Sequence, residues 1–276
     1  MKWAIYRIHY GIDYLKNSIN SIEKDFDKIF IFYSEKPWII KDKIKYKNQY
    51  INFPKNPEKV KDYIIQNFNS SKFIIENYEC NTPFNQFGNL FELAKKKLNI
   101  LPSKVLFMEP DMIFGSNQLN ILNKELNLKF WINSLICRQI ETWKYDNIKK
   151  NKYTYRIKLR KRRTGAVLWK INPAKPVIET EFSGAPQDKI KNFSTFINIL
   201  NMGFSINKET MLYKHLLALA AYESINDSEP DEYWYENKWL NWNEKVIDLD
   251  ISKGSQSSIK EAFKYEIPYK FYQFLK

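Results

Sequence analysis

The stretch VLFMEPDMIFG, residues 105–115, decides the fold. Its first four residues form an unbroken apolar run, which is typical of a strand buried on both faces of a parallel sheet. The run ends at Glu109-Pro110-Asp111, and the chain then becomes apolar again. Because ligands bind beyond the carboxyl ends of strands in open α/β sheets, this acidic turn is also a candidate site.

Strand-like and helix-like stretches alternate on the amino-terminal side of this strand. Gly11 ends the first strand, and Asp13 is predicted to cap the helix that follows. This order predicts an α/β fold, a three-layer α/β/α sandwich with a mostly parallel central sheet. The predicted strands are residues 3–10, 28–33 and 49–53, and the predicted helices are residues 14–26, a segment starting near Pro57, and residues 85–98.

The second half of the chain is less regular. Residues 130–143 and 165–171 are predicted strands, residues 209–222 a helix, and residues 232–243 a second helix rich in tryptophan. The sequence has no internal repeat and no linker rich in Pro, Gly or Ser. We therefore expect one continuous domain over residues 1–276.

Composition excludes several classes of protein. A chain of 276 residues with 44% hydrophobic residues is not disordered, and 11 Pro and 7 Gly are too few for a collagen-like chain. Cys80 and Cys137 cannot form a disulfide framework, so we expect buried thiols in a reducing compartment. The sequence has no run of 18 apolar residues and no signal peptide, so we expect a soluble, cytoplasmic protein without a membrane span.

The net charge of +13 is unevenly distributed. Lysine outnumbers arginine 38 to 6, which is partly the imprint of A/T-rich codons. Residues 149–163 nevertheless hold nine basic and no acidic residues, including four of the six arginines. Residues 223–250 hold nine acidic residues. Such a chain is suited to bind a polyanion at one place and a cation at another.

The acidic turn carries the clearest chemical signal. In an extended chain Glu109 and Asp111 lie on the same side, and Pro110 stiffens the turn between them. Two carboxylates at a strand end suit a hard divalent cation that bridges to phosphate oxygens. The alternative is a charged turn at the surface.

Several motifs resemble those of the nucleotide-sugar glycosyltransferases with the GT-A fold. YRIHYGIDYLKNSINSI resembles their opening unit, NQFGNLFELAKK the helix before their metal-binding strand, and Glu109-Pro110-Asp111 their DxD motif with Glu for the first Asp. The segment that begins NMGFSINKETMLYKHLLALAAYES resembles phage- and virus-type members. The resemblance implies a nucleotide-sugar-binding half, residues 1–118, and an acceptor-side half, residues 119–276.

The resemblance also implies a cofactor and a donor. Asp111 would contact Mn²⁺ or Mg²⁺, and Glu109 would touch the metal or the donor ribose. The metal would bridge the diphosphate of a UDP-linked sugar and neutralise the leaving group. Strand alternation lets only one of the pairs Arg7/His9 and Ile8/Tyr10 line the donor pocket directly. The implied donor-binding residues are Arg7, His9, Tyr10, Tyr33, Gln86, Asn89 and Glu109.

Two further roles stay open. His215 is either a late metal ligand, as in many GT-A enzymes, or a half-buried core histidine. An inverting enzyme needs a carboxylate base, for which Asp188, Asp227, Asp231 and Glu232 are available. The alternative for the acidic segment is a solvated helix start.

The basic segment suggests the acceptor. In a strand Arg156, Lys158, Arg160 and Arg162 share one face, and with Lys152 and Arg163 they would follow a phosphate backbone. Trp143, Tyr153 or Trp169 would stack on a flipped base. These features favour transfer to a hydroxymethylated base of viral DNA. The alternatives are a saccharide acceptor on a lipid or protein, a nucleic-acid-binding protein without catalysis, and a degenerate enzyme.

Overall fold

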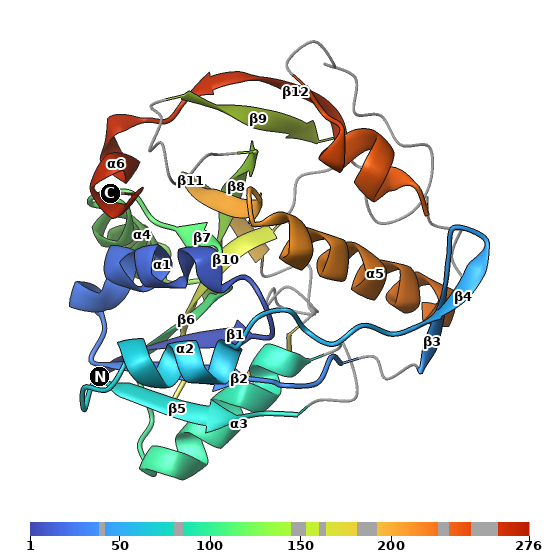
Figure 1. The fold of residues 1–276 in the computed structure, drawn as a ribbon. Coiled ribbons are helices and arrows are strands. Elements are labelled where there is room, and N and C mark those ends of the chain that lie inside the picture. Colours follow the sequence, from blue (N-terminus) through green and yellow to red (C-terminus); the bar gives the residue numbers. More distant parts are fainter. Residues whose placement is uncertain are drawn as a thin grey trace.

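A computed structural model describes the fold around one large curled sheet (Figure 1). It describes residues 1–38, 42–79, 85–144, 153–159, 164–180, 192–225, 232–243 and 259–275. The sheet begins with four parallel strands, in the spatial order β5 (Phe73–Asn77), β2 (Lys28–Tyr33), β1 (Lys2–Ile8) and β6 (Lys104–Met108). The central pair, β1 and β6, is almost entirely buried, as its apolar sequence requires.

The sheet continues beyond β6 in mixed orientation. β10 (Thr164–Lys170) is antiparallel to β6 and to β8 (Ser134–Trp143). β9 (Tyr153–Leu159) and β12 (Ile259–Glu266) extend this end, and β11 (Asn192–Phe204) lies parallel to β8 and antiparallel to the short β7 (Met112–Ile113). The three-layer α/β sandwich predicted from the sequence is confirmed, and its parallel part is the first half of the chain.

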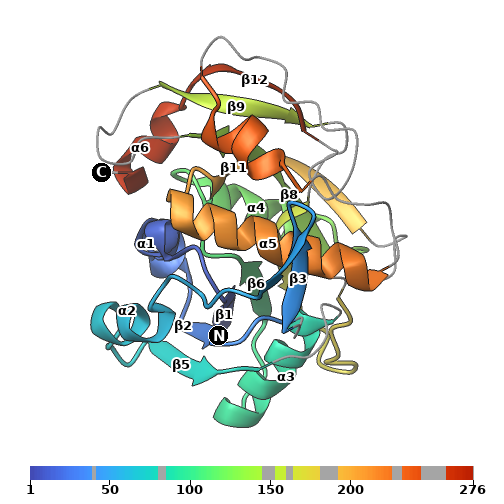
Figure 2. The ribbon, with the colours of Figure 1, turned by 45° about the vertical axis from the view of Figure 1, so that its right-hand side comes forward.

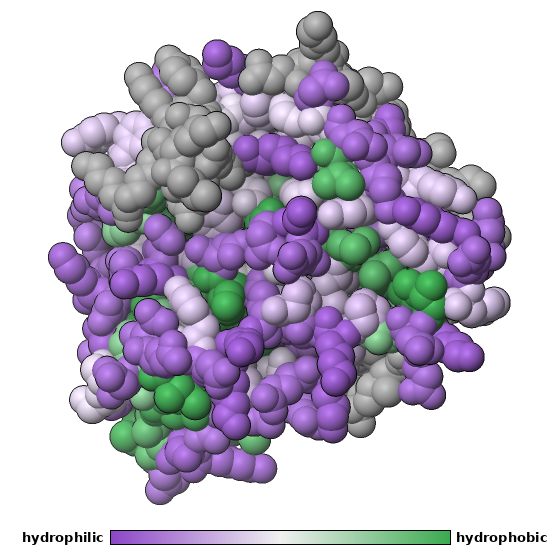
Figure 3. Space-filling view, in the orientation of Figure 1, coloured by the Kyte–Doolittle hydropathy of each residue, from purple (hydrophilic) through white to green (hydrophobic). Residues whose placement is uncertain are grey.

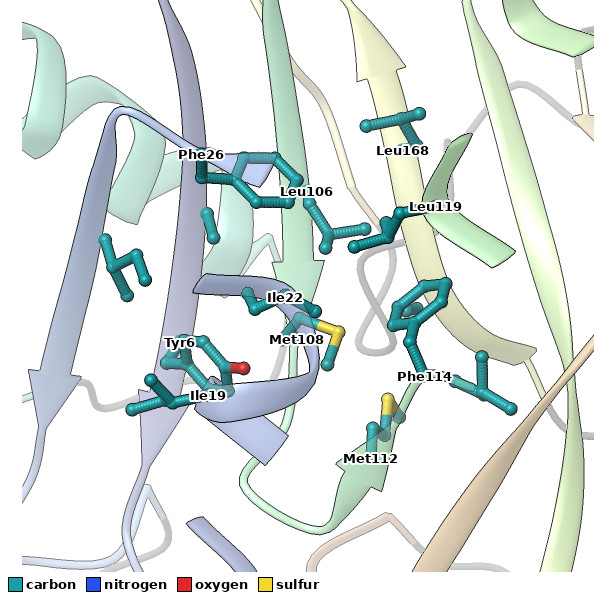
Figure 4. Close-up of a cluster of buried hydrophobic side chains, with 14 of the residues drawn as sticks. Tyr6, Ile19, Ile22, Phe26, Leu106, Met108, Met112, Phe114, Leu119 and Leu168 are labelled. Atoms are coloured by element: carbon teal, nitrogen blue, oxygen red, sulfur yellow. The ribbon is translucent and has the colours of Figure 1, made fainter. Parts of the chain in front are cut away.

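Helices cover both faces of the parallel strands. One face packs against α1 (Leu15–Ile22), α2 (Val60–Asn67) and α4 (Gln118–Leu128), and the other packs against α3 (Gln86–Leu98). Figure 4 shows the first of these two cores, in which Tyr6 and Met108 from the sheet meet Ile19 and Ile22 of α1. Alternate residues of β1 serve the two cores, since Ala4, Tyr6 and Ile8 enter one and Trp3 and Ile5 the other.

A second group of elements surrounds α5 (Lys208–Ile225). The hairpin of β3 (Lys43–Tyr46) and β4 (Gln49–Asn52) lies against α5, and β9 and β12 arch above it (Figures 1 and 2). The remaining helical elements are the one-turn 3-10 helices η1 (Ile12–Tyr14) and η2 (Glu23–Asp25), the π-helix η4 (Tyr235–Leu240) and α6 (Tyr269–Leu275). Within the described ranges, no helix is both long and apolar enough to cross a membrane.

Three details differ from the sequence prediction. Residues 49–53 do form a strand, but it pairs within the separate β3–β4 hairpin and not within the large sheet. Strands β3, β5, β7, β11 and β12 were not predicted. Asp13 does not cap α1, because it lies inside the short helix η1 and its Oδ2 accepts hydrogen bonds from Asn207 N and Nδ2. The predicted cap is therefore wrong, and the carboxylate instead ties the start of α1 to the start of α5.

Candidate active site

The carboxyl ends of β1 and β6 are where a ligand is expected. Helices α1 and α2, which follow β1 and β2, cover one face of the sheet, whereas α3, which precedes β6, covers the other. The chain therefore changes sides between β1 and β6, and ligands in open α/β sheets bind at such a switch point, beyond the carboxyl ends of the strands. Arg7 and Tyr10 come from the end of β1, and Glu109 and Asp111 follow β6.

Arg7 is the centre of this cluster. Its Nη1 donates to Gln86 Oε1 at 2.6 Å, and its Nη2 donates to Glu109 Oε1 at 2.5 Å. The guanidinium also lies 5.1 Å from the ring centroid of Phe87 and 5.7 Å from that of Trp38. The Arg7 side chain is only 12% exposed, so these contacts fix the guanidinium.

The turn after β1 brings Tyr10 to the same carboxylates. β1 ends at Ile8, and Gly11 adopts a left-handed conformation with φ of 90°. Burial raises the pKa of Tyr10, and the negative charges of Glu109 and Asp111 raise it further. Arg7 and Tyr10 therefore both lie near Glu109, and the expectation that only one alternating pair lines the donor pocket stays a prediction. The alternation ends with the strand.

His9 belongs to the wall of the site. Its Nδ1 lies 2.9 Å from the carbonyl oxygen of Ser34, which can only accept, so this nitrogen carries the proton. Nε2 therefore accepts from the hydroxyl of Tyr213, at 2.7 Å. Burial lowers the pKa of His9, and the positive charge of Arg7 lowers it further, so the ring is neutral near pH 7. Both nitrogens are engaged within the protein.

Glu58 holds the turn after β1 against α5. Its Oε2 accepts from Gly11 N at 2.7 Å and Ile12 N at 3.1 Å, and its Oε1 accepts from Thr210 Oγ1 at 2.8 Å. Burial raises the pKa of this carboxyl. Nearby, a cavity of about 520 Å³ is lined by residues 34–37, 54–56, 58–62 and Tyr213. The turn that carries Tyr10 is thus rigid and has a cavity beside it.

Asp111 lies at the opposite wall, against β11. Its carbonyl oxygen accepts from Met202 N at 2.8 Å. A side chain at Gly203 would place its Cβ 2.5 Å from Asp111 Oδ2 and 2.9 Å from Lys214 Nζ, and Lys214 Nζ donates to Gly203 O at 2.8 Å. A lysine ammonium therefore lies close to the Asp111 carboxylate. Sequence reasoning missed Gly203 and Lys214, because their partners lie about 100 residues away.

The acidic triplet is a turn and not an extended segment. Met112 N donates to Glu109 O at 3.2 Å, which closes a four-residue turn around Pro110 and Asp111. The prediction that both carboxylates point to the same side, made for an extended chain, is therefore wrong. Glu109 reaches toward β1, and Asp111 reaches toward β11.

A divalent cation fits Asp111 better than it fits Glu109. Glu109 is engaged by Arg7 through Oε1, whereas Gly203 leaves room for the Asp111 carboxylate beside the switch point. No group of three His, Cys, Asp or Glu able to hold a metal occurs in the described part of the chain. Mg²⁺ is commonly held by one or two carboxylates together with substrate phosphates. The residues therefore fit a cation that is bound jointly with a diphosphate, with Asp111 as the protein ligand.

His215 has the contacts of a core residue. Its ring lies 5.7 Å from that of Trp234 and 6.4 Å from that of Tyr235, stacked on the latter, and the residue is 2% exposed. Its Nε2 lies 3.3 Å from the carbonyl oxygen of Glu232. These contacts are those of the core alternative for His215, and its role as a metal ligand stays a prediction.

The remaining predicted residues divide into three sets. Tyr33 is buried in the core beneath α1 and α2, and Asn89 is exposed on α3. Glu232 is tied to the β3–β4 hairpin, since its Oε2 accepts from Asn48 N at 2.8 Å and its Oε1 lies 3.5 Å from Lys45 Nζ. The predicted residues Cys80, Lys152, Arg160, Arg162, Arg163, Asp188, Asp227 and Asp231 lie outside the described residues.

The basic segment is confirmed as a strand over part of its length. Arg156 and Lys158 lie in β9, where their register partners in β12 are Phe263 and Glu261. Trp143 is fully buried against Phe204, so the prediction that it stacks on a base is wrong.

Comparisons with solved structures give distant similarities. One is to residues 1–349 of S. aureus TarS, with 9% identity, a TM-score of 0.41, and coverage of 87% of this chain and 70% of that chain. The complex of the same fragment with UDP-GlcNAc gives 10% identity and a TM-score of 0.41, over 87% of this chain and 72% of that one. A third similarity is to the 4-diphosphocytidyl-2C-methyl-D-erythritol synthase of Anaerococcus prevotii, with 12% identity and a TM-score of 0.40. It covers 81% of this chain and 96% of that chain. No protein-family model and no curated protein sequence matches the chain.

Proposed function

We propose that this protein is a glycosyltransferase that moves a sugar from a nucleotide sugar, UDP-linked, to a hydroxyl acceptor. The observation that carries the proposal is the cluster at the switch point of the sheet. There Arg7, Tyr10 and Glu109 form one wall and Asp111 the other. The motifs that resemble GT-A enzymes supply these same residues, from the end of β1 and the turn after β6.

Each residue has a distinct task in this proposal. Arg7 holds Glu109 through Oε1, which leaves Oε2 to accept from the ribose hydroxyls of the donor. Asp111 holds Mn²⁺ or Mg²⁺ together with the diphosphate, and Lys214 adds positive charge beside it. The cation, when bound, neutralises the charge that develops on the leaving diphosphate. Tyr10 closes the pocket between the two carboxylates.

The acceptor that we propose is a hydroxymethylated base of DNA. The arginine-rich segment, residues 149–163, supports it, because arginine clusters bind phosphate backbones and because A/T-rich codons account for arginine less readily than for lysine. β9, which contains part of this segment, lies on the far side of α5 from the switch point (Figure 1). The phosphate backbone would then bind on a surface separate from the donor, while the acceptor hydroxyl itself must reach the donor at the switch point.

Donor binding is tested first. We expect UDP with Mn²⁺ to raise the melting temperature of the wild-type protein, and UDP alone to raise it much less. In Asp111→Asn the difference between the two conditions should disappear while the unliganded melting temperature stays close to that of the wild type. An equal response to UDP with and without Mn²⁺ in the wild type would refute the cation part of the proposal.

The acceptor is tested separately. Nucleotide sugars are incubated with hydroxymethylated DNA, plain DNA and saccharides, and the products are identified by mass spectrometry. Changing Arg156, Arg160, Arg162 and Arg163 to Gln should reduce DNA affinity and lower the slope of log affinity against log salt by about one per lost phosphate contact. Donor hydrolysis should be unchanged. Sugar transfer to saccharide and not to DNA would replace the DNA acceptor with the saccharide alternative.

A further inference from the structure

Large apolar side chains protrude at the amino-terminal edge of the sheet, which is opposite the switch point. Leu128, Phe130 and Trp131, at the end of α4 and in the loop before β8, are 77%, 78% and 62% exposed. Ile100 and Leu101, in the loop between α3 and β6, are exposed as well. Apolar side chains also gather at the lower left of Figure 3, where α3 ends in Figure 1.

The two loops lie at the same edge because both are bonded to the end of β10. Lys170 N donates to Asn133 O at 2.7 Å, two residues after Trp131. Ile171 N donates to Ser103 O at 3.0 Å, two residues after Leu101. We call the surface formed by Ile100, Leu101, Leu128, Phe130 and Trp131, together with the lysines described next, the amino edge.

A row of three lysines crosses the amino edge. Lys104 of β6 is the register partner of Lys2 in β1 and of Lys170 in β10, so the three side chains stand next to each other on one face of the sheet. Burial lowers the pKa of Lys104, and the charges of Lys2 and Lys170 lower it further. Its Nζ donates to Asn123 Oδ1 of α4 at 2.9 Å, which places the row beside the helix that ends in Leu128. Like charges in direct cross-strand register are unfavourable unless an anion compensates them.

We propose that the amino edge binds the surface of an anionic lipid bilayer. Protruding Leu, Phe and Trp side chains enter the boundary between headgroups and acyl chains, and a lysine row binds anionic headgroups. Acidic groups at this edge are already engaged: Asp27 Oδ2 accepts from Lys2 N at 2.6 Å, and Glu125 pairs with Lys129 at 2.6 Å.

Other occupants fit the amino edge less well. A second copy of the chain, related by a twofold axis, would bring an identical lysine row against the first, and like charges would repel. A nucleic acid would find the lysines but would gain little from the aliphatic side chains of Leu128, Ile100 and Leu101, which cannot stack on bases as aromatic rings do. A bilayer uses both the charge and the apolar side chains.

Binding through this edge would leave the candidate active site in water. Parallel strands place their amino ends at one edge and their carboxyl ends at the other, so Arg7, Glu109 and Asp111 would face away from the membrane. Donor and acceptor would then enter from the aqueous side. The proposal is independent of which reaction the site performs.

The experiment uses the full chain and two kinds of vesicle, phosphatidylcholine alone and phosphatidylcholine with phosphatidylserine. We expect cosedimentation with the anionic vesicles and little with the neutral ones. Among the described residues Trp131 is the one tryptophan that is strongly exposed, so its entry into lipid should shift the fluorescence of the protein to the blue. Trp131→Phe should still bind and should lose most of that shift.

Three variants separate the contributions. Lys104→Gln should weaken binding to anionic vesicles about fivefold. Phe130→Ser should weaken it roughly tenfold, because an apolar side chain no longer enters the lipid. Tyr50→Ser removes an equally exposed aromatic side chain from the β3–β4 hairpin and should bind like the wild type. Melting curves check that each variant is folded.

Two results would overturn the proposal. One is wild-type binding that is no stronger to anionic than to neutral vesicles. The other is a dimer in light scattering without lipid that Phe130→Ser dissociates, since the apolar side chains would then be covered by a second copy.

Discussion

Replacing Gly203 with alanine should abolish the proposed sugar transfer while the protein stays folded. The added Cβ would lie 2.5 Å from Asp111 Oδ2 and 2.9 Å from both Asn201 Oδ1 and Lys214 Nζ. Cβ atoms do not approach other heavy atoms so closely, so at least Asp111 must move. Because all three atoms are ends of side chains, β11 itself can keep its place. The structural change should therefore be concentrated in the Asp111 carboxylate and its neighbours.

The expected magnitudes differ sharply for stability and for activity. Overpacking by one methyl group costs about 1–3 kcal/mol, and about 1 kcal/mol lowers the melting temperature of a chain of this size by about 2–4 °C. Displacement of a positioned catalytic group by about 1 Å costs about a hundredfold in rate. We therefore expect a melting temperature lower by several degrees and a loss of roughly two orders of magnitude in sugar transfer.

Gly115→Ala is the matched control. Its Cβ would lie 2.7 Å from Lys270 Cγ and 3.2 Å from Gln118 Oε1, so it meets side chains of α6 and α4 and not the switch point. It should lower the melting temperature comparably and leave transfer and cation-dependent UDP binding unchanged. Calorimetric UDP titration with Mn²⁺ and a transfer assay measure the difference between the two variants. Equal UDP affinity and transfer in both would show that Asp111 does not act at the site as described.

Four other changes test the site. Asp111→Asn should abolish cation-dependent UDP binding. Glu109→Gln should weaken UDP binding less, but it should lower the melting temperature because the partly buried Arg7 loses its counter-charge. Melting curves and UDP titrations distinguish the two variants. Burial lowers the pKa of His9, so the unfolded chain binds a proton more readily than the folded chain does. The stability that neutral His9 contributes is therefore present above about pH 6.5 and is lost as the pH falls below it. Urea unfolding at several pH values should show a smaller loss of stability at low pH in His9→Gln than in the wild type. His215→Ala should lower the melting temperature by several degrees and leave the manganese dependence of UDP binding intact, whereas reduced manganese affinity would support its role as a ligand.

The parallel half of the fold could be predicted because its signals are local. β1, β2 and β6 are continuous apolar runs, and α3 has an apolar face, so each element is visible within a dozen residues. β11 was missed because its alternating pattern is interrupted by polar residues such as Asn201, whose side chain donates to Gln139 of β8. A single sequence does not reveal such partners.

The residues of the candidate site could be predicted from the sequence, but the contacts between them could not. Glu109 and Asp111 were found from the strand that precedes them, but their separate partners depend on the arrangement of distant segments. Arg7 meets Glu109 because β1 and β6 are neighbours in register. Lys214 lies near Asp111 because α5 packs over β11. These contacts join residues about a hundred positions apart, which no local pattern encodes.

The turn at Glu109-Pro110-Asp111 joins the two halves of the molecule, and this explains why its two acids cannot have the same role. The Glu109 carboxylate is bonded to β1, within the parallel half, and the main-chain carbonyl oxygen of Asp111 accepts from Met202 N of β11, within the mixed half. Between them Pro110 packs against Gly11, where a Cβ would lie 3.4 Å from Pro110 Cγ, so the turn is also held from the side of Tyr10. A ligand that contacts both carboxylates must therefore lie across the junction of the halves. Its binding would stabilise that junction, and substitutions at either acid would act on donor binding and on the contact between the halves together.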